Sequence, residues 1–145
     1  MAHVGEERRL RHARRFHARE LEHRTGIKAL EGQARLLLND LREYRAWVER
    51  AEGISLTRPE ATRRWLSDVF LPVLERIEGA IGPDRDRIQA YCDVLETKWI
   101  LSERARRDVG LRAAIDSYLE QGAPAPLWNR KLSNATANPH FDALG

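Results

Sequence analysis

One stretch of apolar residues constrains the fold more than any other part of this sequence. Its members recur at alternating intervals of three and four residues: Ile27, Leu30, Ala34, Leu37, Leu41, Tyr44, Val48 and Ala51. This spacing places all eight on one helix face, so it predicts a helix over residues 27–51 that ends at Gly53. A helix of this length, about 37 Å, cannot cover its own apolar face. The rest of the chain must therefore supply its packing partners.

The composition indicates that those partners are also helices. Of the 145 residues, 42% are hydrophobic and 32% are charged, and Arg, Glu, Leu and Ala outnumber the strand-favouring Val, Ile and Thr. We therefore predict an all-α fold, a single helical bundle of about five helices. No run of about 20 apolar residues is present, so we expect no membrane interaction. The single cysteine and the absence of an apolar leader core indicate a cytoplasmic protein.

The expected bundle covers residues 1–122, and an extended tail rich in Pro and Asn covers 123–145. The other helices are expected over residues 6–23, 57–77, 84–107 and 110–122. Thr57 and Glu60 form a capping box for the third helix, which Pro72 should kink. Asp108 is a candidate cap for the fifth helix. The fourth helix has a broad apolar stripe, made of Ile88, Tyr91, Cys92, Leu95 and Trp99.

The first expected helix is strongly basic. Residues 1–28 hold eight Lys or Arg and four Glu, a surplus that exceeds the net charge of +3 of the whole chain. Four arginines share the face opposite the apolar side: Arg8, Arg11, Arg15 and Arg19. Such a face could bind phosphates of RNA or DNA, with Arg130 and Lys131 of the tail contributing. The alternative is a solvated surface whose arginines are offset by nearby glutamates.

No set of residues with catalytic or metal-binding spacing is found. Glu20 and His23 form one Glu-x-x-His pair, whereas a di-iron bundle needs two. Cys92 lies on an apolar stripe, where a buried thiol stays protonated and inert. Phosphate-binding glycine loops are missing. We therefore predict no enzyme activity, no bound metal and no cofactor.

The tail carries isolated apolar residues that could bind either the protein's own bundle or a partner. Trp128, Leu132 and Phe141 stand apart in an otherwise polar segment. Both interpretations remain open.

Residues 95–110, with the sequence LETKWILSERARRDVG, resemble a run typical of the actinobacterial domain-of-unknown-function family 4032. Residues 25–27 and 33–46, and Trp65-Leu66 with Pro72, also resemble that family, so the likeness covers roughly residues 20–120. In that family the domain often follows a region similar to lipopolysaccharide kinases. The resemblance therefore implies an accessory or regulatory module. This chain has no kinase loops, and Thr97 stands where the family run has histidine.

The resemblance also directs attention to the polar residues around the turn between the fourth and fifth helices. These are Trp99, Ser102, Glu103, Arg106, Arg107 and Asp108. They could form a binding surface, together with Asn39, Asp40 and Arg42. The alternative is structural, with Arg107 and Asp108 forming a cap and an ion-pair network.

Two functions follow as hypotheses. The first is a non-enzymatic module that binds a protein partner, a kinase-like subunit or a larger assembly, through this turn and the residues Trp128 and Phe141. The second is an RNA- or ribosome-associated protein that uses the basic first helix and the tail.

Overall fold

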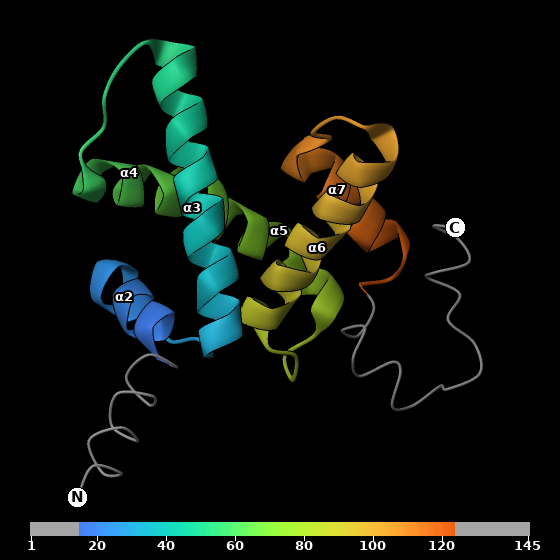
Figure 1. The fold of residues 1–145 in the computed structure, drawn as a ribbon. Helices are drawn as coiled ribbons and strands as arrows, with labels where there is room; N and C mark the ends of the chain where they lie inside the picture. The colour runs from blue at the N-terminus through green and yellow to red at the C-terminus, as the bar shows by residue number, and fades with distance from the viewer. Residues whose placement is uncertain (1–14, 124–145) are drawn as a thin grey trace, which may run out of the picture. The chain divides into compact units, whose positions relative to one another are not determined.

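A computed structural model describes residues 15–123 of the chain (Figure 1). Its helices are α2 (Phe16–Thr25), α3 (Glu31–Glu52), α4 (Arg58–Trp65), the π-helical turn η1 (Leu66–Phe70), α5 (Leu71–Ile81), α6 (Arg87–Ala105) and α7 (Gly110–Glu120). Residues 15–123 contain no strand, which confirms the predicted all-α class. These residues form two compact units, divided after Arg76 within α5. None of the described helices is both long and apolar enough to cross a membrane.

The predicted central helix is present as α3, but it begins four residues later than expected. Gly26 ends α2 in the left-handed conformation, and the Thr25 hydroxyl accepts a hydrogen bond from the Ile27 N–H. These contacts hold the chain outside the helical conformation up to Leu30, whose N–H donates to the Gln33 side chain. The C-terminal end is as predicted, because Gly53 adopts the left-handed conformation at φ 66°. Four stripe residues are buried: Ala34, Leu37, Leu41 and Val48.

The N-terminus of α2 is capped by a side chain from α3. Glu31 accepts hydrogen bonds from the backbone N–H groups of His17 and Ala18, at 3.3 and 3.0 Å, and its carboxylate lies 2.5 Å from His17 Nδ1. Burial alone would raise the pKa of Glu31, but these hydrogen bonds outweigh it and lower that pKa below its ordinary value of 4.5. The charged form of Glu31 therefore stabilises the contact between α2 and α3.

This cap makes stability depend on pH in a defined direction. Because folding lowers the pKa of Glu31, its contribution is complete above about pH 4.5 and is lost as the pH falls through the lowered value. We expect Glu31→Gln to cost about 1 kcal/mol at pH 7 and to flatten the loss of stability below pH 4.5. Urea denaturation at several pH values measures both effects. The matched control is Glu22→Gln on the exposed side of α2, which should change neither.

The third helical segment begins as predicted and passes Pro72 in an unexpected way. Thr57 and Glu60 form the capping box, with the hydroxyl and carboxylate each accepting a backbone N–H at 3.2 Å. The irregularity expected at Pro72 takes the form of the π-helical turn η1, in which the Leu71 N–H donates to the Leu66 carbonyl. A π-turn rearranges the carbonyls that a proline ring would otherwise contact, so the helix continues into α5.

Trp65 is the largest buried side chain of the first unit. It is fully buried at the end of α4, and its ring centroid lies 5.1 Å from that of Phe70. Its Nε1–H donates a hydrogen bond of 2.9 Å to Oδ2 of Asp40, a buried residue of α3. Trp65 therefore joins α3 to the α4–η1 segment through both apolar packing and a polar contact.

The second unit is built on the packing of α7 against α6. Asp86 caps α6 by accepting hydrogen bonds from Ile88 N–H and Gln89 N–H, at 2.9 and 3.2 Å. Three residues of α7 are buried: Ala114, Ile115 and Tyr118. Cys92 is buried too, as expected from its place on the stripe.

Candidate functional site

The C-terminal end of α6 closes with an arginine in a conformation that favours glycine. Arg106 has φ 55°, its N–H donates to the Glu103 carbonyl, and the Arg107 N–H donates to the Ser102 carbonyl at 3.2 Å. This is the Schellman arrangement of a helix end, in which glycine is the usual residue at the left-handed position. A non-glycine residue there costs about 1 kcal/mol. The chain therefore tolerates strain at an exposed arginine.

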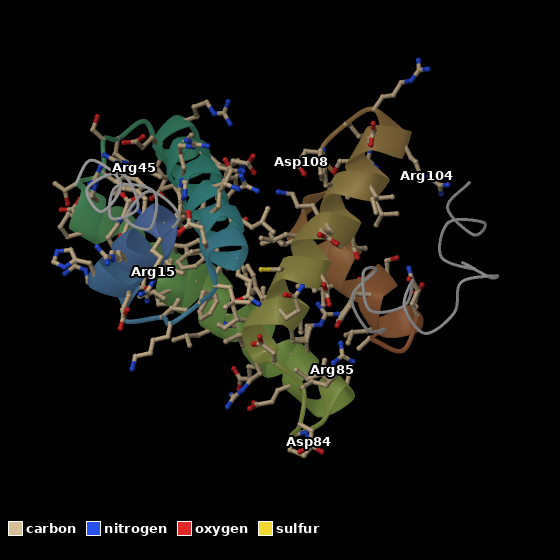
Figure 2. The ribbon with its side chains drawn as sticks, turned by 60° about the horizontal axis from the view of Figure 1, so that its bottom comes forward. Arg15, Arg45, Asp84, Arg85, Arg104 and Asp108 are labelled. Atoms are coloured by element: carbon tan, nitrogen blue, oxygen red, sulfur yellow. The ribbon has the colours of Figure 1, made fainter. Side chains whose placement is uncertain are left out.

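Two of the residues singled out by the sequence have structural roles at this turn. The Ser102 hydroxyl accepts the Val109 N–H at 3.1 Å, and Asp108 Oδ1 accepts the Gly110 N–H at 2.9 Å. Asp108 also lies 3.8 Å from Lys98 Nζ. The residue at the N-cap position of α7 is Val109 and not Asp108, but Asp108, one residue earlier, still accepts the first N–H of the helix. Its ion-pair partner in the described chain is Lys98 and not Arg107. Figure 2 labels Arg104 and Asp108 at this end of α6.

Trp99 corrects the prediction of a buried apolar stripe along the whole of α6, because its side chain is 73% exposed. Residues 90–94 are all buried, so the first part of α6 is covered on every side. In the rest of α6 only Thr97 is buried. At about 100° of rotation per residue, the side chain of Trp99 points about 160° around the helix axis from that of Thr97. The predicted apolar stripe is therefore buried at Tyr91 and Cys92 but exposed to solvent at Trp99.

The described part of the basic first helix carries two of its four predicted phosphate-binding arginines. Arg15, which precedes α2, and Arg19 within it are exposed. Other predicted binding residues lie outside the described residues: Arg8, Arg11, Trp128, Arg130, Lys131 and Phe141.

The three α3 residues proposed to extend the binding surface are not equivalent. Asp40 is buried and accepts the Trp65 hydrogen bond, so it is part of the core. Asn39 bonds to Arg42 and Glu43 of its own helix. These residues belong to the first unit, whereas the turn after α6 belongs to the second.

The structure reveals a site that the sequence analysis missed, a groove of about 620 Å³ in the first unit. Its walls come from α2, α3 and the start of α4, and five of its twelve lining residues are arginines: Arg24, Arg35, Arg42, Arg45 and Arg58. We call it the arginine groove. Among the described residues, Glu20 is the only acid that lines it. The sequence held a partial signal, because Arg35 and Arg42 lie seven residues apart on one helix face, but the groove exists only once three helices have packed.

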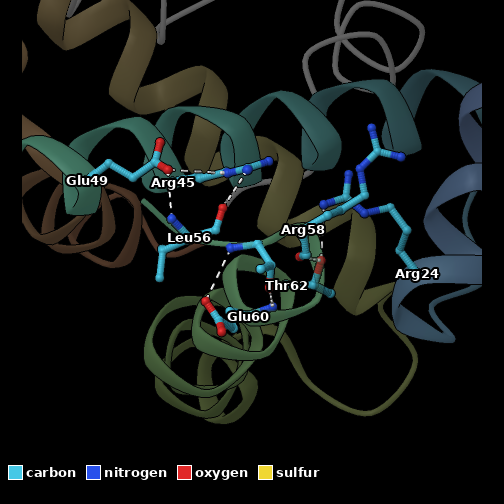
Figure 3. Close-up of polar contacts among 8 residues, drawn as sticks. Arg24, Arg45, Glu49, Leu56, Arg58, Glu60 and Thr62 are labelled. Atoms are coloured by element: carbon cyan, nitrogen blue, oxygen red, sulfur yellow. Dashed lines mark hydrogen bonds and ion pairs between the residues drawn. The ribbon is translucent and has the colours of Figure 1, made fainter. Parts of the chain in front are cut away.

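Figure 3 shows how the guanidinium groups of the groove are held. Arg24 Nη2 donates to the Thr62 hydroxyl at 3.0 Å, and Arg45 Nη2 donates to the Leu56 carbonyl at 2.6 Å. Burial, and then the positive charge of Arg58, lowers the pKa of Arg24 from its ordinary value. The cations of this groove therefore repel one another.

The histidines of the described chain do not converge on a site. His17 pairs with Glu31, and no group of three or more His, Cys, Asp or Glu within residues 15–123 could hold a metal ion.

Comparison with known proteins gives one match. The model of a family described as Domain of unknown function (DUF4032) matches residues 5–122, a span that includes every described helix and confirms the resemblance noted for residues 95–110. No curated protein and no solved structure matches the chain.

Proposed function

We propose that this chain, which belongs to the DUF4032 family, is a non-enzymatic helical module that binds a protein partner through the end of α6. The proposed contact is the α6 corner, defined as Trp99, Glu103, Arg106, Arg107 and Asp108. The observation that carries the proposal is the exposure of Trp99. Tryptophan is enriched at the energetic centres of protein interfaces, where its indole ring is buried by the partner.

The charges around Trp99 support the same function. Glu103, Arg106, Arg107 and Asp108 are all exposed, so charged side chains follow one large exposed apolar side chain along the same end of α6, as in the polar rim of an interface. Arg106 adds a second observation, because glycine would occupy its left-handed conformation without strain. A strained residue on an exposed surface is a reason to look for a contact that uses its side chain.

The absence of enzymatic activity is part of the proposal. Cys92, the one candidate nucleophile considered, is buried on α6 and is not among the residues that line the arginine groove. We also propose that the protein works in the cytoplasm, which suits a single buried thiol.

The experiment compares two tryptophan variants in affinity purification from the native host, with and without nuclease. We expect Trp99→Ala to lose a protein partner at least tenfold, because an interface tryptophan contributes about 2 kcal/mol or more. The matched control is Trp47→Ala, a residue of α3 that is 61% exposed. Retention of the partner by both variants would contradict the proposal.

The nuclease arm and a direct measurement complete the design. Loss of all bound material after nuclease would favour the RNA-associated alternative, for which charge reversal at the exposed Arg15 and Arg19 is the test. Any partner recovered is then purified, and its affinity for the wild type and for both variants is measured by calorimetry. Both variants should unfold at the wild-type urea concentration, because neither removes a buried side chain.

A further inference from the structure

The arginine groove concentrates positive charge far beyond the average of its surroundings. Residues 15–76 hold twelve Lys or Arg and ten Asp or Glu, so this part of the chain is nearly balanced. Five of those twelve cations line the groove, against one of the ten acids. Surface arginines that serve only solubility are usually interspersed with acids.

The single acid cannot neutralise the cations that surround it. The same oxygen of Glu20 lies 3.9 Å from Arg24 Nη1 and 4.0 Å from Arg58 Nη1, at the outer limit of an ion pair. Arg24 Nε is buried and has no hydrogen-bond partner among the described residues. A buried donor without a partner is costly, so an acceptor entering from the groove would relieve this cost.

The other three arginines of the groove differ in how their guanidinium groups are held. Arg42 is held by Asn39, and Arg45 is held by the Leu56 carbonyl and by Glu49, whose oxygen lies 3.8 Å from Arg45 Nε. Arg35 is exposed, and no contact within the described chain constrains its guanidinium group. Guanidinium groups bind phosphate through paired N–H donors. The five arginines all line the same groove, so several of them could bind one ligand.

We propose that the arginine groove binds a small organic ligand that carries at least two phosphoryl groups beside an apolar or aromatic portion. The phosphoryl groups would lie among Arg24, Arg35 and Arg58. Nucleoside di- and triphosphates belong to this chemical class. This binding site is separate from the α6 corner and does not depend on the function proposed for it.

The apolar lining and the size of the groove argue for an organic ligand of this kind. Phe16 contributes a half-exposed ring, and Leu36 and Leu38 line the same space. A volume of about 620 Å³ lies within the range of about 300–1,000 Å³ that is typical of small-molecule sites. Arg15 and Arg19, which a nucleic acid strand would also use, do not line the groove.

The test is calorimetric titration of the full chain with ATP, pyrophosphate, inorganic phosphate and adenosine. We expect one site per chain with a Kd of about 10–100 μM for ATP, weaker binding of pyrophosphate, and no binding of adenosine alone. Affinity should fall as salt is raised, because the contact is ionic.

A matched pair of double variants locates the site. Arg35→Gln with Arg58→Gln changes α3 and α4 inside the groove, and should weaken ATP binding by about tenfold or more. Arg50→Gln with Arg63→Gln changes the same two helices and the same charge at exposed positions outside the lining, and should weaken it less than about twofold. All four positions are accessible to water in part or in full, so folding should persist, and a circular dichroism melt checks this for each variant.

Three results would overturn the proposal. One is the absence of saturable binding by any phosphorylated probe in the folded wild type. Another is equal weakening by both double variants, which indicates unspecific charge attraction. The third is a twelve-nucleotide single-stranded RNA that binds more tightly than ATP and responds equally to both variants, which assigns the arginines to nucleic acid. The Trp99→Ala variant should bind ATP with wild-type affinity. A failure of the ATP test therefore leaves the proposal for the α6 corner unaffected, and the reverse also holds.

Discussion

Replacing Trp65 with alanine is expected to lower the free energy of unfolding of the first unit by about 3–5 kcal/mol. The substitution removes a fully buried indole ring, its contact with Phe70 and the hydrogen bond donated to Asp40. The cavity would lie between α3 and the α4–η1 segment, where rigid helices prevent collapse onto the vacant space. A loss of this size is a large part of the total stability of a small domain.

Two comparisons divide the effect of Trp65 into its parts. Trp65→Phe keeps an aromatic ring but removes the donor to Asp40, and should cost about 1–3 kcal/mol. Trp47→Ala removes an exposed ring and should change stability by less than about 0.5 kcal/mol. Urea denaturation, together with hydrogen exchange of α3 and α4 amides, measures these values. A Trp65→Ala variant as stable as Trp47→Ala would contradict the described packing.

Replacing Tyr118 with alanine should produce the largest loss in the second unit, about 3 kcal/mol. Tyr118 is buried on α7, which packs against α6. Its hydroxyl lies 3.4 Å from Arg85 Nη2, and Arg85 Nη1 donates to the Ala123 carbonyl at 2.9 Å. Arg85, labelled in Figure 2, thus fastens the end of α7 to the segment that precedes α6.

The control for Tyr118 is the phenylalanine variant. Tyr118→Phe keeps the ring and removes the hydroxyl that accepts the long hydrogen bond from Arg85, so it should cost less than about 1 kcal/mol. Hydrogen exchange of the α6 and α7 amides reports the second unit separately from the first. Equal losses in the alanine and phenylalanine variants would show that the hydroxyl, and not the ring, is the stabilising group.

Much of the helical architecture follows from local sequence chemistry. Gly53 and the pair Thr57 and Glu60 were predicted from residue type alone, because left-handed conformations and capping boxes depend on a few neighbouring atoms. The buried members of the α3 stripe, such as Leu37 and Leu41, follow from periodicity.

The predictions were wrong where contacts outside a single helix determine the structure. The start of α3 depends on how Thr25 and Gly26 end the preceding helix, which periodicity does not report. The exposure of Trp99 depends on where the covering elements of α6 stop. Single-helix angles give the direction of a side chain but not what lies opposite it.

The candidate sites show the same division. The residues of the α6 corner were singled out through the family resemblance of residues 95–110, and they lie near one another along one helix and its turn. The arginine groove was missed because Arg24, Arg42 and Arg58 come from three helices, and no spacing along the chain relates them. Its acid-poor lining is a property of the packed unit.

The cap that Glu31 provides for α2 has a consequence for the order of folding. Only 13 and 14 residues separate Glu31 from the two amides that it accepts, so joining them closes a short loop at low entropic cost. The same carboxylate lies in the first turn of α3, so a single contact stabilises the starts of two helices. Contacts this local form early in small helical proteins. We therefore expect the pair of α2 and α3 to form early in the folding of the first unit, before α4 and Trp65 pack against it.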